Sequence, residues 1–180
     1  LFDLGKVIVD FEKRLEIINR SVKNICDQEK CKSIVDNNLL DEITALCEWP
    51  TALLCHFDRE FLSLPKECLI LTMQRHQKYI PLTENDGTLS NKFIVITNNA
   101  PKDTTKIRIG NERVLRARLN DAHFFFLKDQ EKPLIERKDD LSAVIYHNLL
   151  GSLGERTKRI KSLLIDWAKK INLDTSDCIT

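Results

Sequence analysis

Glycine and proline are scarce in this sequence, with five of each among 180 residues. No glycine belongs to a GxGxxG, GxxxxGK[ST] or GxSxG pattern, which argues against phosphate-cradling loops and against a nucleophile elbow. The sequence also lacks an apolar run of roughly 18 residues, so no membrane span is predicted. The sequence also lacks an excess of positive or negative charge, because 28 Lys and Arg nearly balance 27 Asp and Glu. Neither a polybasic nor an acidic tail therefore dominates the chain.

An initiator methionine is also missing, since the sequence starts at Leu1. No basic segment followed by an apolar segment suggests a signal peptide. We therefore expect this chain to be a piece of a longer protein. Its 42% hydrophobic and 31% charged residues are typical of a globular protein with a core.

Six cysteines are present, at irregular spacings and mostly with apolar neighbours. A chain of this length can bury a core without disulfides. Cys26 and Cys31 lack the second close pair, or the pair of histidines, that a zinc finger needs. The sequence therefore predicts reduced, buried thiols, no metal site and a reducing, cytoplasmic location.

Hydrophobic periodicity predicts several helices and a few short strands. The expected helices are residues 10–28, 29–47 with an interruption at 36–38, 65–76, 108–129 and 151–171. The expected strands are 52–57, 79–83, 93–97 and 143–146. Asn85–Gly87 has turn composition, so the strands on either side of it are expected to pair as an antiparallel hairpin.

This order of elements predicts an α+β fold, with helices packed around a small, mostly antiparallel sheet. We divide the chain into three segments. Residues 1–47 are a helical N-terminal segment, residues 48–150 an α+β module, and residues 151–180 a C-terminal helical segment.

No residue set in the sequence predicts catalytic chemistry. The four histidines have no metal-binding spacing, and no nucleophile stands out. His56 and Asp58 would share a face of a strand, either as a base and its orienter or as an ordinary surface contact. We therefore expect neither a catalytic nor a metal-ligating residue.

Basic residues are in excess over acidic residues only after residue 72. Five of them are our candidate RNA contacts: Arg75, Lys78, Arg113, Arg116 and Arg118. A positive face with interleaved aromatic side chains can hold phosphates and stack a base. The alternative is a solvated helix surface, on which Glu112 and Arg116 pair at i, i+4.

Several ordered blocks resemble the β subunit of bacterial-type glycyl-tRNA synthetase, over roughly residues 40–162. The blocks are Glu42–Pro50, Phe57–Glu67, Met73–Pro81, Phe93–Asn98, Gly110–Phe125, Leu150–Leu153 and Lys158–Ile160.

The resemblance implies a part of an α2β2 glycine–tRNA ligase that joins glycine to its tRNA. The catalytic site, with ATP and Mg²⁺, is then expected at the α subunit, and no cofactor is expected in this segment. The β subunit is expected to bind tRNA and to continue into an HD-like domain after residue 180. The implied partners are the α subunit and glycine tRNA. Trp49-Pro50, Phe57, Phe61, Phe124 and Phe125 are expected to be core or domain-packing residues.

Three roles remain open at this point. The first is an accessory tRNA-binding region of the ligase. The second is a scaffold that docks the α subunit or other β domains without touching tRNA, and its signature would be exposed apolar residues. The third is an editing-type hydrolase, against which stand the missing nucleophile and the small size of glycine, which leaves a sieve little to exclude.

Overall fold

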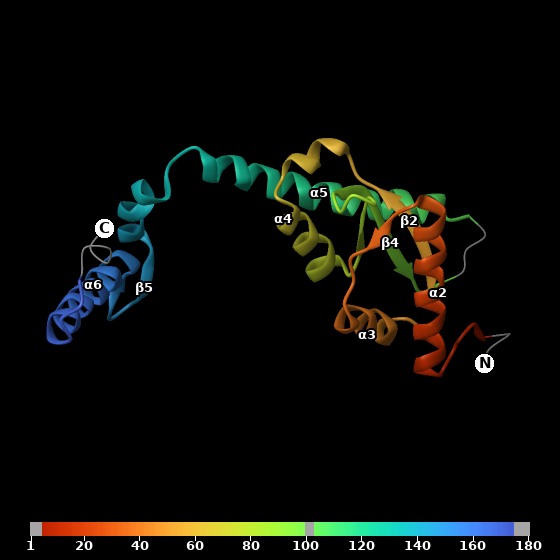
Figure 1. Ribbon diagram of the computed structural model, residues 1–180, viewed down its shortest axis with the longest axis horizontal. Coiled ribbons are helices and arrows are strands. Elements are labelled where there is room, and N and C mark those ends of the chain that lie inside the picture. Colours follow the sequence, from red (N-terminus) through yellow and green to blue (C-terminus); the bar gives the residue numbers. More distant parts are fainter. Residues whose placement is uncertain (1–4, 100–102, 175–180) are drawn as a thin grey trace. The chain divides into compact units, whose positions relative to one another are not determined.

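The computed structural model describes residues 5–99 and 103–174 (Figure 1). The chain forms two compact units, Leu1–Phe126 and Leu127–Thr180, and each is described by itself. The three-segment division made from the sequence stays a prediction. Cys178 lies outside the described residues.

The first unit is built on a four-stranded antiparallel sheet with the order β1-β3-β4-β2. Its strands are β1 (Lys32–Ser33), β2 (Thr51–His56), β3 (Ile80–Thr83) and β4 (Leu89–Thr97). The predicted hairpin is confirmed, since β3 pairs with β4. At its turn, the Asp86 carboxylate accepts hydrogen bonds from the backbone N–H and the hydroxyl of Thr88, at 2.9 and 2.7 Å.

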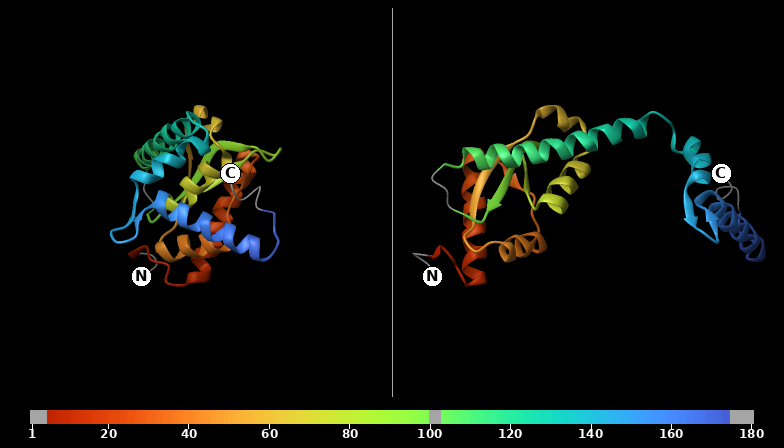
Figure 2. Two further views of the ribbon diagram at one scale, coloured as in Figure 1. Left: turned by 90° about the vertical axis from the view of Figure 1, so that its left-hand side faces the viewer. Right: turned by 180° about the vertical axis from the view of Figure 1, so that it is seen from behind.

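Helices cover both faces of this sheet, which makes three layers (Figure 2). α2 (Phe11–Glu29) and α3 (Asn37–Leu46) pack on one face. α4 (Lys66–Leu71), its π-helical extension η2 (Thr72–His76), the 3₁₀ turn η1 (Arg59–Ser63) and α5 (Thr105–Gln130) pack on the other. The α+β prediction is confirmed.

Strand β4 shows why both faces are covered. Successive side chains of a strand point to opposite faces. Ile94 accordingly packs with the helix pair α2 and α3, while Phe93 and Val95 pack with α4 and α5. All three side chains are buried. A central strand that is apolar on both faces needs a helical layer on each side.

The predicted helix 29–47 is wrong in its first half. α2 ends at Lys30, which takes a left-handed conformation with φ 52°, and Lys32–Ser33 then pairs with β3 as β1. Asp36 is the N-cap of α3, because its side chain accepts a hydrogen bond from Leu39 N at 2.8 Å. The polar residues that suggested an interruption are therefore a helix start.

The second unit consists of η3 (Leu134–Ala143), the hairpin of β5 (Ile145–His147) and β6 (Gly151–Ser152), and α6 (Leu153–Lys170). Ser152 and Glu155 form a capping box at the start of α6. Within the described part of this unit, only Gly154 and Ala168 are buried. No helix of the described residues, in either unit, is long and apolar enough to cross a membrane.

The five described cysteines are free, and four of them are buried, as predicted. Cys55 is fully buried, and burial, with Glu112 nearby, raises the pKa of its thiol to about 12. We expect iodoacetamide at pH 8 to label the half-buried Cys68 in the native protein and to leave Cys55 unmodified. Mass spectrometry with and without urea measures this, and labelling of native Cys55 would contradict the buried position.

The same shift fixes the sign of the pH dependence. An unfolded Cys55 thiol titrates near pH 9.0, whereas the folded one keeps its proton up to about pH 12. The native state therefore binds more protons in this window, so its stability falls as the pH rises from about 9 towards 12.

Candidate nucleic-acid interface

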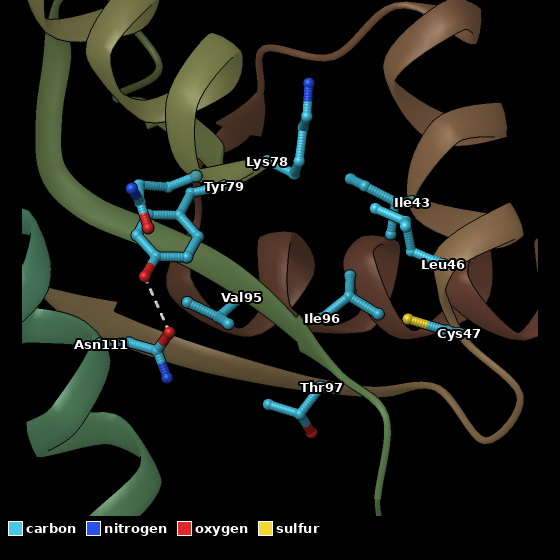
Figure 3. A pocket seen from close by; sticks show the side chains of 10 residues that line it. Ile43, Leu46, Cys47, Lys78, Tyr79, Val95, Ile96, Thr97 and Asn111 are labelled. Carbon is cyan, nitrogen blue, oxygen red and sulfur yellow. Dashed lines mark hydrogen bonds between the residues drawn. The ribbon is translucent and has the colours of Figure 1, made fainter.

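A cavity of about 350 Å³ lies in the first unit, where α3, β3, β4 and α5 meet (Figure 3). Figure 3 shows Tyr79 and Asn111 on one side and residues of α3 on the other, above the end of β4. The full lining is Ile43, Leu46, Cys47, Gln77, Lys78, Tyr79, Val95, Ile96, Thr97 and Asn111. The cavity therefore joins an apolar floor to a polar rim.

Tyr79 connects the start of β3 to α5. Its hydroxyl donates a hydrogen bond to Asn111 Oδ1 at 2.8 Å, and Asn111 Nδ2 donates to the carbonyl of Ile107 at 2.8 Å. The Tyr79 ring lies 5.0 Å from the ring of Phe93. Burial raises the pKa of Tyr79 to about 12, so the phenol keeps its proton and remains a donor.

Lys78 has an unusual backbone for a lysine, with φ 56°. It ends the α4–η2 helix, where Tyr79 N donates to Met73 O at 3.0 Å and Lys78 N donates to Gln74 O at 3.1 Å. Glycine is the residue most often found at such a helix end, and a side chain there costs about 1 kcal/mol. The Nζ atom of Lys78 lies 2.8 Å from Glu42 Oε1, at the rim of the cavity.

The predicted arginines are exposed, but α5 does not bring them onto one face. Arg118 lies about 140° around the helix axis from Arg113. Arg116 Nε is 2.9 Å from Asp58 Oδ2, and the Glu112 carboxylate accepts a hydrogen bond from His56 N at 2.9 Å. These contacts replace the Glu112–Arg116 pair that was weighed from the sequence.

Arg75 is exposed on η2, three residues before Lys78. The structure thus places Lys78 at the cavity, Arg75 nearby along the chain, and the three arginines along α5. The His56 Nδ1 atom lies 4.0 Å from Glu112 Oε1, and Asp58 pairs with Arg116, so both side chains lie against residues of α5. The five RNA contacts remain predictions.

The family model described as "Glycyl-tRNA synthetase beta subunit" matches residues 2–178. This chain belongs to the glycyl-tRNA synthetase β subunit family. The chain is similar to the glycine–tRNA ligase β subunit of Neisseria meningitidis serogroup C (strain 053442), with 44% identity over 172 residues, or 96% of this chain and 25% of that protein.

Two further relatives have the same description. The glycine–tRNA ligase β subunit of Acidovorax sp. (strain JS42) is 46% identical over 161 residues, which is 88% of this chain and 22% of that protein. The one of Polaromonas naphthalenivorans (strain CJ2) is 44% identical over 172 residues, or 94% and 24%. The chain therefore spans about a quarter of the length of the curated relatives that it matches.

The sequence blocks that carried the resemblance meet at the cavity. Residues of 42–50, 73–81, 93–98 and 110–125 line it or bond across it. Asn98 Oδ1 adds a further link, because it accepts hydrogen bonds from Glu48 N at 2.7 Å and Trp49 N at 2.8 Å. Blocks that are separate in the sequence therefore form one local structure.

Four phenylalanines were predicted to be core or domain-packing residues, and Phe57 and Phe61 are buried core residues. Phe124 and Phe125 are not core residues of the described chain, because their side chains are 56% and 64% exposed, with ring centroids 5.5 Å apart. Packing of these two side chains against another domain stays a prediction. The exposure of Phe124 could have been predicted from the sequence. Leu115, Leu119 and Phe126 define the inner stripe of α5, and Phe124 lies about 160° around the helix axis from Phe126.

Three residues of the cavity were not predicted as site residues from the sequence. Gln77, Tyr79 and Asn111 belong to the blocks that carried the resemblance, but nothing in their spacing showed that they would meet. Only the packing of α5 on the sheet brings Asn111 to Tyr79.

Proposed function

We propose that this chain is an accessory tRNA-binding region of a cytoplasmic glycine–tRNA ligase that attaches glycine to its tRNA with ATP. The α subunit supplies the catalytic site with ATP and Mg²⁺, and this segment contributes binding. The observation that carries the proposal is the outer face of α5. There Arg113, Asn120 and the exposed Phe124 recur at i, i+7 and i+11, which is one helical stripe.

Such a stripe suits RNA for two physical reasons. Exposed guanidinium groups bind phosphates and release counterions from the RNA, which drives binding at low salt. An exposed aromatic ring stacks on an unpaired base, a contact that duplex grooves do not offer. Lys78 adds a cation that the fold holds in an unfavourable backbone conformation, and such strain is often found at functional sites.

Lys78→Gly tests this proposal without removing a core group. Glycine relieves the left-handed backbone, so we expect the free energy of unfolding to stay level or to rise by about 0.5–1 kcal/mol. Loss of the cation is expected to reduce the salt slope of tRNA binding by about one unit. Fluorescence titrations of glycine tRNA across a salt series measure the slope, and urea unfolding measures the stability.

Lys30→Gly is the matched control. Lys30 has the same left-handed conformation, with φ 52°, at the end of α2, and its side chain is exposed. This variant loses the same charge and gains the same backbone freedom, so its salt slope is expected to stay that of the unaltered protein. Equal slopes for the two variants would remove Lys78 from the RNA contacts.

The second unit favours a second role, as a scaffold. Its exposed large apolar side chains include Leu134, Ile135, Ile145, Leu149, Leu163 and Trp167. Such a gathering of exposed large apolar side chains in one small unit favours a surface that another protein surface covers. The α subunit of the same ligase, or another part of the β subunit, is the partner that this role would need.

One experiment separates the two roles. Binding to glycine tRNA and to an unrelated tRNA is measured at several salt concentrations. Affinity that falls linearly in log salt supports the tRNA-binding role, and a preference for glycine tRNA makes it recognition. No binding to either tRNA at low salt, together with binding to the purified α subunit, would favour the scaffold.

A further inference from the structure

The proposed RNA contacts on the outer face of α5 do not include the cavity beside Tyr79. Its volume of about 350 Å³ falls in the range of roughly 300–1,000 Å³ that small-molecule sites occupy. We propose that it takes one unstacked base of an RNA strand, adenine first, with the phosphate of that nucleotide at Lys78. This inference rests on the proposed tRNA-binding function and names the part of the RNA that this site holds.

The walls suit a flat, apolar surface. Ile43 and Leu46 come from α3, and Val95 and Ile96 come from β4. Leu46 is 63% exposed although it lines the cavity, so an apolar contact there is still available. RNA-binding proteins commonly hold a splayed-out base against such side chains, because every base has an apolar face.

The rim supplies the groups that read a base edge. The Asn111 amide is already used by Tyr79 and Ile107. Among the described residues, by contrast, the side-chain amide of the half-buried Gln77 makes no hydrogen bond that would occupy it. An amide offers a donor and an acceptor side by side, and glutamine matches adenine in this way.

Lys78 is placed to hold the phosphate. Figure 3 shows its side chain extending away from Val95 and Thr97, and Lys78 is one of the residues that line the cavity. Its amine is paired with Glu42, and both side chains are partly exposed. A phosphate would therefore exchange with the Glu42 carboxylate, which means that Glu42 competes with the ligand.

The test uses nucleoside monophosphates and this chain with labelled methyl groups. We expect AMP at millimolar concentration to shift the methyl signals of Ile43, Leu46, Val95 and Ile96, and to do so more than CMP or UMP. Glu42→Gln is expected to tighten AMP binding a few-fold, since it removes the competing carboxylate.

Leu46→Trp tests the cavity by filling it. We expect it to weaken the binding of AMP about tenfold, because the indole ring occupies volume that the base needs. Leu71→Trp is the matched control, because Leu71 is a similarly exposed leucine, 53% against 63%, on α4 and outside the lining. Circular dichroism shows that both variants keep their fold.

The outcomes test the base site separately from the proposed tRNA-binding function. If no nucleotide shifts the cavity methyls, or if Leu46→Trp binds AMP as well as Leu71→Trp does, the base site is wrong. Persistent tRNA binding in that case leaves the proposed function standing. If neither tRNA nor any nucleotide binds, both are overturned.

Discussion

Replacing Phe93 with alanine is expected to lower the free energy of unfolding by about 3–5 kcal/mol. Phe93 is fully buried in the middle of β4, where it pairs with Cys55 on β2 and Pro81 on β3. Its ring lies 5.0 Å from that of Tyr79 and 6.4 Å from that of Phe57. The cavity left behind would therefore open at the centre of three strands. Urea unfolding followed by circular dichroism measures the loss.

Phe124→Ala is the control, because it removes the same atoms from an exposed position. Its effect on stability is expected to stay within about 0.5 kcal/mol. Phe124→Ala is expected to affect tRNA binding more than it affects stability, because the variant loses an aromatic ring that stacks on a base. A comparable loss of stability in the two variants would mean that Phe124 is covered in the native protein.

Local signals were enough to predict most elements. The long apolar stripe of Leu115, Leu119 and Phe126 predicted α5, and the Asn85–Gly87 turn predicted the β3–β4 hairpin. Both depend on residues close together in the sequence, where period and turn chemistry act directly.

The failures arose where distant residues decide the structure. Lys32–Ser33 forms a strand only because β3 lies beside it, and two residues carry no period of their own. Asp36 was taken as part of an interruption, although the same side chain that disfavours a helix interior caps a helix start.

The candidate site was predictable only in its parts. The sequence nominated Lys78 and Arg113 from their charge, which is a local property. It could not show that Glu42 would pair with Lys78, or that Asn111 would accept from Tyr79, because 36 and 32 residues separate these partners. Sheet register and helix packing bring these partners together, and neither can be predicted from a single segment of the sequence.

The double change Arg113→Ala with Arg118→Ala is expected to have the largest effect on tRNA binding. Both guanidinium groups are exposed. Arg113 lies on the proposed contact stripe and Arg118 about 140° from it, so the salt slope falls by about one unit if RNA contacts the stripe alone, and by about 1.5–2 units if RNA also contacts the other side of α5. Stability is expected to stay within about 0.5 kcal/mol, as for other exposed positions.

Lys13→Ala with Lys23→Ala on the exposed side of α2 is the matched control for this change. It removes two positive charges as well, so a general loss of attraction to RNA would appear equally in both variants. A slope that changes only for the α5 pair therefore assigns the phosphates to that helix.

Arg116 belongs in this comparison as a third case. Its ion pair with Asp58 is partly exposed and contributes about 0–1 kcal/mol to stability. Because Asp58 already offsets its charge, Arg116→Ala is expected to change the slope less than Arg113→Ala does. If Arg116→Ala instead has the largest effect, the RNA approaches α5 from the side of η1. The stripe of Arg113, Asn120 and Phe124 would then not be the contact surface.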